Sequence, residues 1–342
     1  MPSRPQLAAL LDRLGLARAV LALRARPGFP WQWLTVLTYH RVAPTLAPGF
    51  DPDVLDASPE GFERQLEFLQ RHFTLIDTRD LDLWRAGGSL PRNCAMLTFD
   101  DGYRDNHDVV LPILRRRQAK AVFFVATSYI DERRVFWWEL VHHALAATTR
   151  ARLSLSYPEP WDFSLVDGPQ RRAAVASLLR LLKQQAGVDM NRFLAELFAA
   201  AEVPFGRDRE RQMAHELLMT WDHVRALAAA GLDVQSHSYA HRVLHTLTPE
   251  QARADLLRAR QDLEAAIERP VQAVAYPTGR PLGNAPALRQ ALDAGYRYGF
   301  TVERLVPIDR LSDWLGIPRM MIDQTVTDSF FRTTLAVPSL SY

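Results

Sequence analysis

The sequence predicts a (β/α) barrel of seven or eight parallel strands that carries a helical insertion. Short apolar segments alternate with helical segments along the chain, which is typical of a parallel sheet covered by helices. There are eight such apolar segments, enough to close a barrel. One interval, from Ala126 to Leu232, is about a hundred residues long where a connection between parallel strands needs a few tens, so it indicates an insertion.

The strands are predicted from runs of apolar and β-branched residues that end at polar or turn-forming residues. They cover residues 34–39, 73–77, 95–99, 121–126, 232–236, 273–276, 298–302 and 317–322. The helices are predicted from apolar residues at helical spacing, with Ser58 and Thr248 as N-caps and Gly295 as a closing residue. They cover residues 59–71, 78–86, 106–117, 221–230, 249–268 and 285–294, and the insertion contributes 171–185 and 191–201.

We expect a barrel domain at residues 31–330, an insertion at about 131–218 and a C-terminal tail at 331–342. Residues 1–30 hold one amphipathic helix, from about Leu7 to Arg26, whose charged residues interrupt any secretory signal. No apolar run reaches the ~18 residues that a membrane span requires. We therefore expect a cytoplasmic protein whose N-terminal helix packs on the barrel, with peripheral membrane contact through the basic face of this helix as the alternative.

Composition narrows the class of protein further. With 48% hydrophobic and 23% charged residues, the chain can bury a full core. The 41 basic residues are interleaved with 39 acidic ones, so no basic stripe predicts binding to nucleic acid. The single cysteine, Cys94, lies in an apolar run and is predicted to be a core thiol.

The strongest chemical signal is the pair Asp100 and Asp101, which follows the strand 95–99 directly and precedes Gly102. Two adjacent carboxylates at the end of a buried strand cost free energy unless they are paired or bound to a metal. A carboxylate on a metal stays ionised, while its neighbour can serve as a base. The glycine permits the tight turn that lets both side chains reach one rim.

A second signal is the pair His237 and His241, directly after the strand 232–236. On a turn of helix, histidines at this spacing face the same side, as two ligands of one ion must. Two histidines and a carboxylate leave an open coordination position, which is the arrangement of a catalytic zinc site. Alone this pair is a weak signal, but with Asp100 and Asp101 at another strand end it is hard to explain as chance.

Two weaker signals lie at further strand ends. Residues 275–279 read Ala-Tyr-Pro-Thr-Gly, a turn where the backbone N–H of Thr278 could face a developing oxyanion. His40 follows the first strand. A structural role is at least as well supported for each of these on its own.

These motifs resemble the polysaccharide deacetylase family, also called the NodB-homology or carbohydrate esterase family 4 group, whose fold is a distorted barrel. Residues 98–101, Thr-Phe-Asp-Asp, match its first motif, which implies that Asp100 is the general base and Asp101 a metal ligand. Residues 237–241, His-Ser-Tyr-Ala-His, match its second motif, which implies that His237 and His241 bind the metal. The resemblance runs from about Leu34 to Ile322, interrupted by the insertion.

The chain departs from the common family pattern in two places. The third motif commonly reads Arg-x-Pro-Tyr, but Ala275 and Thr278 stand where its arginine and tyrosine would be, as in the branch with a Tyr-Pro-x-Gly form. The histidine of a C-terminal Leu-x-His motif often supplies the acid, but no histidine follows His245. By the resemblance to members with an N-terminal Tyr-His segment, the acid is expected to be His40, with His245 as the alternative.

The resemblance further implies that Arg319 orients the base and that the metal is a divalent ion, with Zn²⁺ expected first. The implied reaction removes N-acetyl groups from amino sugars of a polysaccharide or glycan intermediate. The rival interpretation is a catalytically weak or inactive carbohydrate-binding protein on the same fold, which only the missing C-terminal acid supports. Phe136, Trp137 and Trp138 could stack on sugars, although burial in a core is the ordinary fate of such a cluster. Neither the sugar nor the oligomeric state follows from the sequence.

Overall fold

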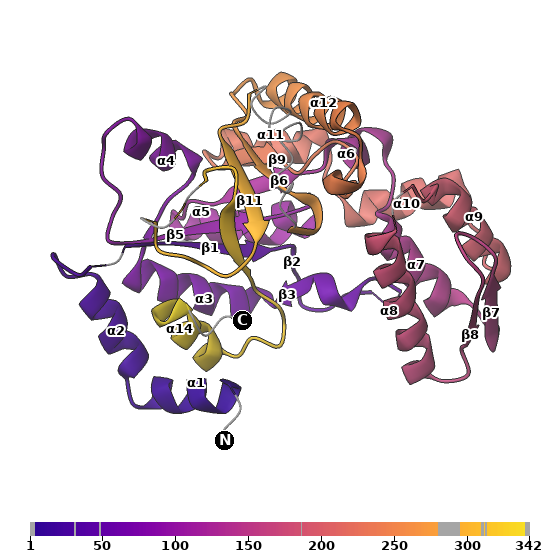
Figure 1. The fold of residues 1–342 in the computed structure, drawn as a ribbon, viewed down its shortest axis with the longest axis horizontal. Coiled ribbons are helices and arrows are strands. Elements are labelled where there is room, and N and C mark those ends of the chain that lie inside the picture. The colour runs from indigo at the N-terminus through magenta and orange to yellow at the C-terminus, as the bar shows by residue number, and fades with distance from the viewer. Residues whose placement is uncertain are drawn as a thin grey trace. The chain divides into compact units, whose positions relative to one another are not determined.

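The computed structural model describes residues 4–30, 32–47, 49–185, 187–279, 295–308, 311 and 313–338. The chain forms two compact units. The first comprises Met1–Pro44, Asp53–Thr127 and Met219–Tyr342, and the second comprises Thr45–Pro52 and Ser128–Leu218. Figure 1 labels the helices and strands of both units.

Seven parallel strands close into a barrel in the first unit, which confirms the predicted fold class. Around the barrel the order is β1, β12, β11, β10, β9, β6, β5, and β5 pairs back onto β1 along its whole length. The strands are β1 (Trp33–Tyr39), β5 (Asn93–Phe99), β6 (Val122–Val125), β9 (Asp233–Ser236), β10 (Ala273–Ala275), β11 (Tyr298–Val302) and β12 (Ile317–Met321). The eighth predicted strand is the two-residue β4 (Thr74–Leu75), which pairs on the outside with the start of β5.

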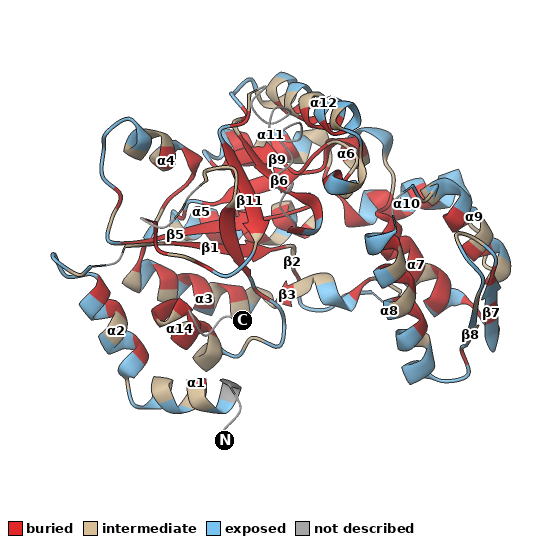
Figure 2. Cartoon of the chain, in the orientation of Figure 1, coloured by how far each residue is buried: buried red, intermediate tan, exposed pale blue. Residues whose placement is uncertain are grey.

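The barrel strands are buried over nearly their full length (Figure 2), as expected when both faces of a sheet are covered. β5 is buried at every one of its positions, including Cys94, which is the predicted core thiol. Burial raises the pKa of Cys94 to about 12, so it stays a neutral thiol. Aromatic rings pack between the strands and α3, with Phe99 stacked on Tyr39 at 5.4 Å and on Phe123 at 5.0 Å, and with Phe62 of α3 edge-on to Tyr39 and Phe99.

Helices connect the strands as the sequence indicates. They are α3 (Pro59–His72), α4 (Thr78–Arg85), η2 (Asn106–Val110) with α5 (Leu111–Arg117), α11 (Trp221–Ala229) and α12 (Pro249–Ile267). The hydroxyl of Ser58 caps α3, and Thr248 and Gln251 form a capping box at α12. The first turn after Asp105 is a π-helix, where the sequence predicted a regular helix. The predicted helix at 285–294 lies outside the described residues.

The N-terminal segment and the C-terminal segment pack together, which the sequence did not predict. Instead of one helix the chain forms α1 (Arg4–Arg13) and α2 (Leu16–Arg24), because Gly15 adopts a left-handed conformation with φ of 70°. The expected tail at 331–342 was wrong in part, since α14 (Asp328–Ala336) begins at a Thr327 cap and packs against α1 and α2 (Figure 1).

Among its described residues, the second unit contains four longer helices and a hairpin, besides the short helix α6 (Thr127–Glu132). They are α7 (Trp137–Ala147), α8 (Gly168–Gln184), α9 (Met190–Ala200), α10 (Arg207–Leu217), and the antiparallel strands β7 (Arg152–Leu155) and β8 (Trp161–Ser164). Residues 45–52 join this unit, because the backbone N–H of Asp51 donates to Glu139 at 2.7 Å and its carboxylate lies 3.2 Å from His142. Helix α6 leads from β6 into it.

Four short elements border the barrel rim: β2 (Arg41–Val42), β3 (Leu55–Ala57), η3 (Leu244–Thr246) and η4 (Pro277–Gly279). Strand β3 pairs with β2, which brings Asp56 beside His40. Among the described residues no helix is long and apolar enough to cross a bilayer.

Candidate active site

The predicted site residues gather at one end of the barrel, where the parallel strands end. Asp100 and Asp101 follow β5, and His237 follows β9. Tyr39 of β1 is in register with Phe99 of β5, so His40 and Asp100 are the next residues along two adjacent strands. The carboxyl ends of barrel strands are where catalytic residues assemble in this type of fold.

Asp100 is held by Arg319 of β12. The guanidinium donates from Nη1 to Oδ1 and from Nη2 to Oδ2 of Asp100, each at 2.7 Å. Both side chains are buried, and Nη1 also donates to the hydroxyl of Thr98 at 3.2 Å. Burial acts to raise the pKa of Asp100, but Arg319, together with His237 and His40, brings the pKa below its usual value. Asp100 is therefore an oriented, ionised carboxylate, and Arg319 stands where an orienting arginine was expected.

Asp101, His237 and His241 form a buried group that fits a metal ion. Oδ1 of Asp101 lies 3.3 Å from Nε2 of His237 and 3.2 Å from Nε2 of His241. Bonds of about 2.0–2.1 Å to a tetrahedral ion separate two ligand atoms by about 3.3 Å, so these spacings match such an ion. Nδ1 of His237 lies 2.8 Å from the carbonyl oxygen of Ala275, a partner that turns Nε2 toward Asp101.

The electrostatics of the group also suit a cation. Burial acts to raise the pKa of Asp101, but His237 and His241 reverse this and lower it. Burial lowers the pKa of His241, and Asp101 only partly opposes that effect. A deprotonated carboxylate and a neutral imidazole are the protonation states that metal ligands require.

The loop from His237 to His241 is not the helical turn that the sequence suggested. Ser238 and His241 both have positive φ, 66° and 48°, so the two imidazoles converge through an irregular turn. Four of the eight described non-glycine residues with positive φ lie at this rim: Asp101, Ser238, His241 and Thr278. Such backbone conformations persist only where the surroundings enforce them.

Asp255 of α12 enforces this loop, and no motif had marked it. Its buried carboxylate accepts from the backbone N–H of Tyr239 at 2.8 Å and of Ala240 at 3.3 Å. Within the loop the hydroxyl of Ser238 accepts from the N–H of His241 at 3.0 Å. Asp255 is therefore a positioning residue for the two histidines.

His40 also has a partner that the sequence analysis missed. Its Nδ1 lies 3.4 Å from Oδ2 of the buried Asp56, which also accepts from the backbone N–H of His40. Asn106 donates to the carbonyl oxygen of His40 at 2.8 Å. Burial acts to lower the pKa of His40, but Asp56, with smaller effects from Asp101 and Asp100, raises it to about 9.

The neighbouring Arg41 and Asp105 brace this part of the rim. Nε of Arg41 donates to Asp105 at 2.7 Å, and the guanidinium lies over the ring of Tyr103 at 4.9 Å. The carboxylate of Asp105 also accepts from the N–H of Val42 at 3.2 Å. The contacts tie the loop after β1 to the turn after β5.

Thr278 and His245 are exposed, unlike the buried group of Asp101, His237 and His241. Thr278 is exposed in η4, directly past the end of β10, with φ of 62°, and Gly279 closes the turn by donating to Tyr276 at 2.8 Å. His245 is exposed in η3. Of the two candidate acids, only His40 directly follows a barrel strand.

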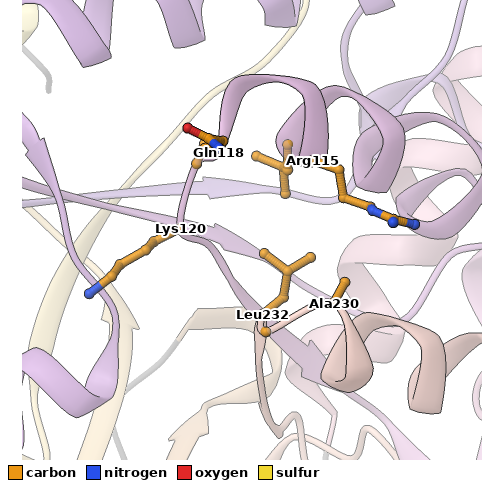
Figure 3. A pocket seen from close by; sticks show the side chains of 8 residues that line it. Arg115, Gln118, Lys120, Ala230 and Leu232 are labelled. Carbon is orange, nitrogen blue, oxygen red and sulfur yellow. The ribbon is translucent and has the colours of Figure 1, made fainter.

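A surface cluster of titratable residues and a pocket lie apart from this site. His107, Asp108 and His223 cluster on the outer surface, but the two imidazoles stack nearly parallel at 4.2 Å, so their in-plane lone pairs do not point to one ion. A pocket of about 380 Å³ lies at the opposite end of β6 and β9, bordered by Lys120 and Leu232 (Figure 3). The predicted core role of Phe136, Trp137 and Trp138 is confirmed, since all three are buried.

A closed parallel barrel with an aspartate, two histidines and an arginine-held carboxylate at its rim defines the class of protein. The chain belongs to the polysaccharide deacetylase family, whose model matches residues 87–151 and 166–299. The unmatched residues between these parts, 152–165, contain the β7–β8 hairpin.

The chain is also similar to individual proteins. It is 26% identical over 272 residues to YxkH of Bacillus subtilis (strain 168), which is itself only provisionally assigned as a polysaccharide deacetylase. That match covers 79% of this chain and 64% of YxkH, so the chain spans less than two thirds of this relative. In fold it resembles the deacetylase PplD of Streptococcus pyogenes, solved with acetate, with a TM-score of 0.56 and 15% identity over 89% of this chain and 99% of PplD. IcaB of Ammonifex degensii is similar, with a TM-score of 0.54 and 17% identity over 90% and 97% of the two chains.

Proposed function

We propose that the protein is a metal-dependent hydrolase that removes N-acetyl groups from amino sugars of a polysaccharide or glycan intermediate. The observation that carries this proposal is the adjacency of two differently held carboxylates, Asp100 on Arg319 and Asp101 on His237 and His241. Environments that give neighbouring titratable groups different roles are typical of acid–base catalysis. Family membership supports the same reaction.

In the proposed mechanism Asp101, His237 and His241 hold a divalent cation, with Zn²⁺ favoured by the two imidazoles and one carboxylate. When bound, such an ion supplies Lewis-acid activation of water and of the amide carbonyl. Asp100, kept ionised and aimed by Arg319, takes a proton from the attacking water. The N–H of Thr278 is proposed to donate to the carbonyl oxygen as negative charge develops there.

Collapse of the tetrahedral adduct then breaks the C–N bond, and the leaving amine needs a proton. We assign this proton to His40, which Asp56 keeps protonated near neutral pH. The products are acetate and a free amine on the sugar. The binding-protein alternative rests on a missing acid, and in this proposal His40, paired with Asp56, supplies that acid.

The proposal is tested by measuring acetate release from a panel of N-acetylated glycans with metal-stripped protein and with the same protein after addition of zinc. We expect release from at least one glycan, loss of release on stripping and recovery on addition of zinc. Release that is unaffected by stripping would contradict the metal-dependent mechanism. Binding of glycans without acetate release under any metal would favour the carbohydrate-binding alternative.

A further inference from the structure

The hairpin formed by α1 and α2 exposes an unusual concentration of apolar side chains. Seven large hydrophobic residues are exposed among the described residues, and four of them fall between residues 10 and 23. They are Leu10, Leu14, Leu16 and Leu23, with 44–63% of each residue exposed. Single exposed leucines are ordinary on protein surfaces, but a cluster of four in one hairpin marks an interaction surface.

These leucines are not covered by their own unit, because hydrogen bonds to α14 already hold the opposite, inner face of the hairpin. Asp12 forms two hydrogen bonds with Arg332 of α14, the closer at 2.6 Å, and Thr333 donates to the carbonyl oxygen of Ala8 at 3.0 Å. Buried Arg24 donates to the carbonyl oxygens of Leu335 at 2.7 Å and Ala336 at 3.1 Å. α1, α2 and α14 lie side by side in Figure 1.

Helical spacing separates the exposed leucines from this inner face. The backbone N–H of Leu14, the first residue after α1, donates to Leu10 at 3.0 Å, so these two leucines lie on one side of the last turn. Leu16 and Leu23 are seven residues apart on α2 and share one side of that helix. On α2 the buried residues Ala17, Leu21 and Arg24 occupy a different side. The outward side of each helix therefore carries its own apolar strip.

The hairpin also carries an excess of basic residues. Residues 1–30 contain five arginines and one aspartate, a net charge of +4, whereas the whole chain carries +2, so the remaining residues carry −2. Asp12 is paired with Arg332, and Arg13, Arg18 and Arg26 are exposed. Exposed leucines interleaved with arginines complement the acyl boundary and the phosphates of an anionic lipid surface.

We propose that the outward face of the α1–α2 hairpin binds an anionic lipid surface peripherally, with its four leucines in the interfacial region and its arginines on headgroup phosphates. This proposal does not depend on the proposed function. The backbone of Leu21 accepts from Asn93 at 3.0 Å, so α2 meets the barrel where β5 begins. The catalytic carboxylates lie at the other end of β5, and lipid binding leaves that end accessible to a glycan.

The test is co-sedimentation of the full chain with vesicles of phosphatidylcholine alone and with about one third phosphatidylglycerol. We expect binding to the anionic vesicles only, weakened by salt. Leu14→Ser with Leu16→Ser should lower the bound fraction, whereas Leu83→Ser, which changes an even more exposed leucine on α4, should not. Arg13→Gln with Arg18→Gln should lower the partition coefficient by about ten-fold or more, compared with Arg115→Gln with Arg253→Gln.

Absence of binding to anionic vesicles, or equal binding to both kinds, would overturn the proposal. It would also be overturned if the hairpin variants and their controls bound alike. A dimer in sedimentation equilibrium that Leu14→Ser with Leu16→Ser dissociates would assign the surface to a second copy of the chain instead. The variants alter exposed side chains only, and melting temperatures verify that they remain folded.

Discussion

At the scale of single residues, Asp56 controls the protonation of His40. A proton donor is active only while protonated, so the proposed activity is present below the pKa of His40 and is lost as the pH rises through it. Asp56 contributes to raising that pKa to about 9, against the effect of burial. Asp56→Asn removes the negative charge, and we expect the alkaline limb of the pH profile of kcat to move to lower pH. A bound divalent cation repels the protonated imidazole, so it shifts the alkaline limb to lower pH in both proteins. The direction of the change caused by Asp56→Asn stays the same.

The turnover of His40→Ala and of His245→Ala shows which of the two histidines donates the proton. Loss of a positioned acid typically lowers turnover by about 10²–10⁴-fold, and we expect this for His40→Ala with metal content unchanged. His245 is exposed in η3, so its replacement should leave kcat near the starting value. An unshifted alkaline limb in Asp56→Asn, or the reverse order of effects for the two histidines, would show that another group donates the proton.

The two main sequence motifs mark the residues that we propose bind the metal or take the proton, and they miss Asp56 and Asp255, which we propose act through other residues. Asp100, Asp101, His237 and His241 stand in short local patterns next to strand ends, so their convergence could be predicted. Asp56 and Asp255 lie 16 and 14 residues from His40 and His241, in β3 and α12. Nothing in the local sequence distinguishes them from surface carboxylates, because their role depends on which backbone N–H groups the fold places beside them.

At the level of elements, Asp255 ties the loop from His237 to His241, which follows β9, to the long, capped helix α12. Asp255→Asn exchanges one acceptor oxygen for a donor group facing the N–H of Tyr239 or Ala240. Mutation of residues that position metal ligands typically lowers metal affinity by about 10–100-fold, and we expect a loss of zinc affinity in that range. A competition titration with a chromophoric chelator measures it.

Glu250→Gln is the matched control, because Glu250 lies on the same helix with an exposed carboxylate. It should leave zinc affinity unchanged. If Asp255→Asn binds zinc as tightly as Glu250→Gln does, with equal melting temperatures, the loop holds its strained conformation without the carboxylate. The positioning role of Asp255 would then be wrong.

Elements with strong local signals were predicted well, and those set by distant contacts were not. The seven barrel strands, β4 and the described barrel helices were predicted, since apolar runs and caps are local properties, whereas β2, β3, β7 and β8 were not. The position of β4 outside the closed ring was not predicted, because the ring closes through the pairing of β1 with β5. The break at Gly15 was also missed, since a single glycine is tolerated within a helix and only its φ of 70° identifies the turn.

At the scale of the whole molecule, the barrel unit gathers its rim from segments spread over most of the chain. His40, Asp100 and His237 directly follow three different strands, Arg319 lies within a fourth, and most of the second unit lies between Asp100 and His237 in sequence. The participation of residues 45–52 in that second unit was not predicted, because it depends on contacts of Asp51 with Glu139 and His142. The barrel itself could be predicted because each strand carries the same signal.

In the proposed mechanism Asp100 acts as the base while Asp101 holds the metal, although the two carboxylates are adjacent in sequence and both are buried. Zinc content and acetate release, measured on Asp100→Asn and Asp101→Asn in parallel, separate these two roles. Asp100→Asn leaves Arg319 buried without its carboxylate, which is destabilising, so retained zinc also reports an intact site. We expect Asp100→Asn to keep its zinc and lose acetate release by about 10²-fold or more, and Asp101→Asn to lose both. Equal loss of zinc in the two variants, or near-normal acetate release from Asp100→Asn, would contradict the account.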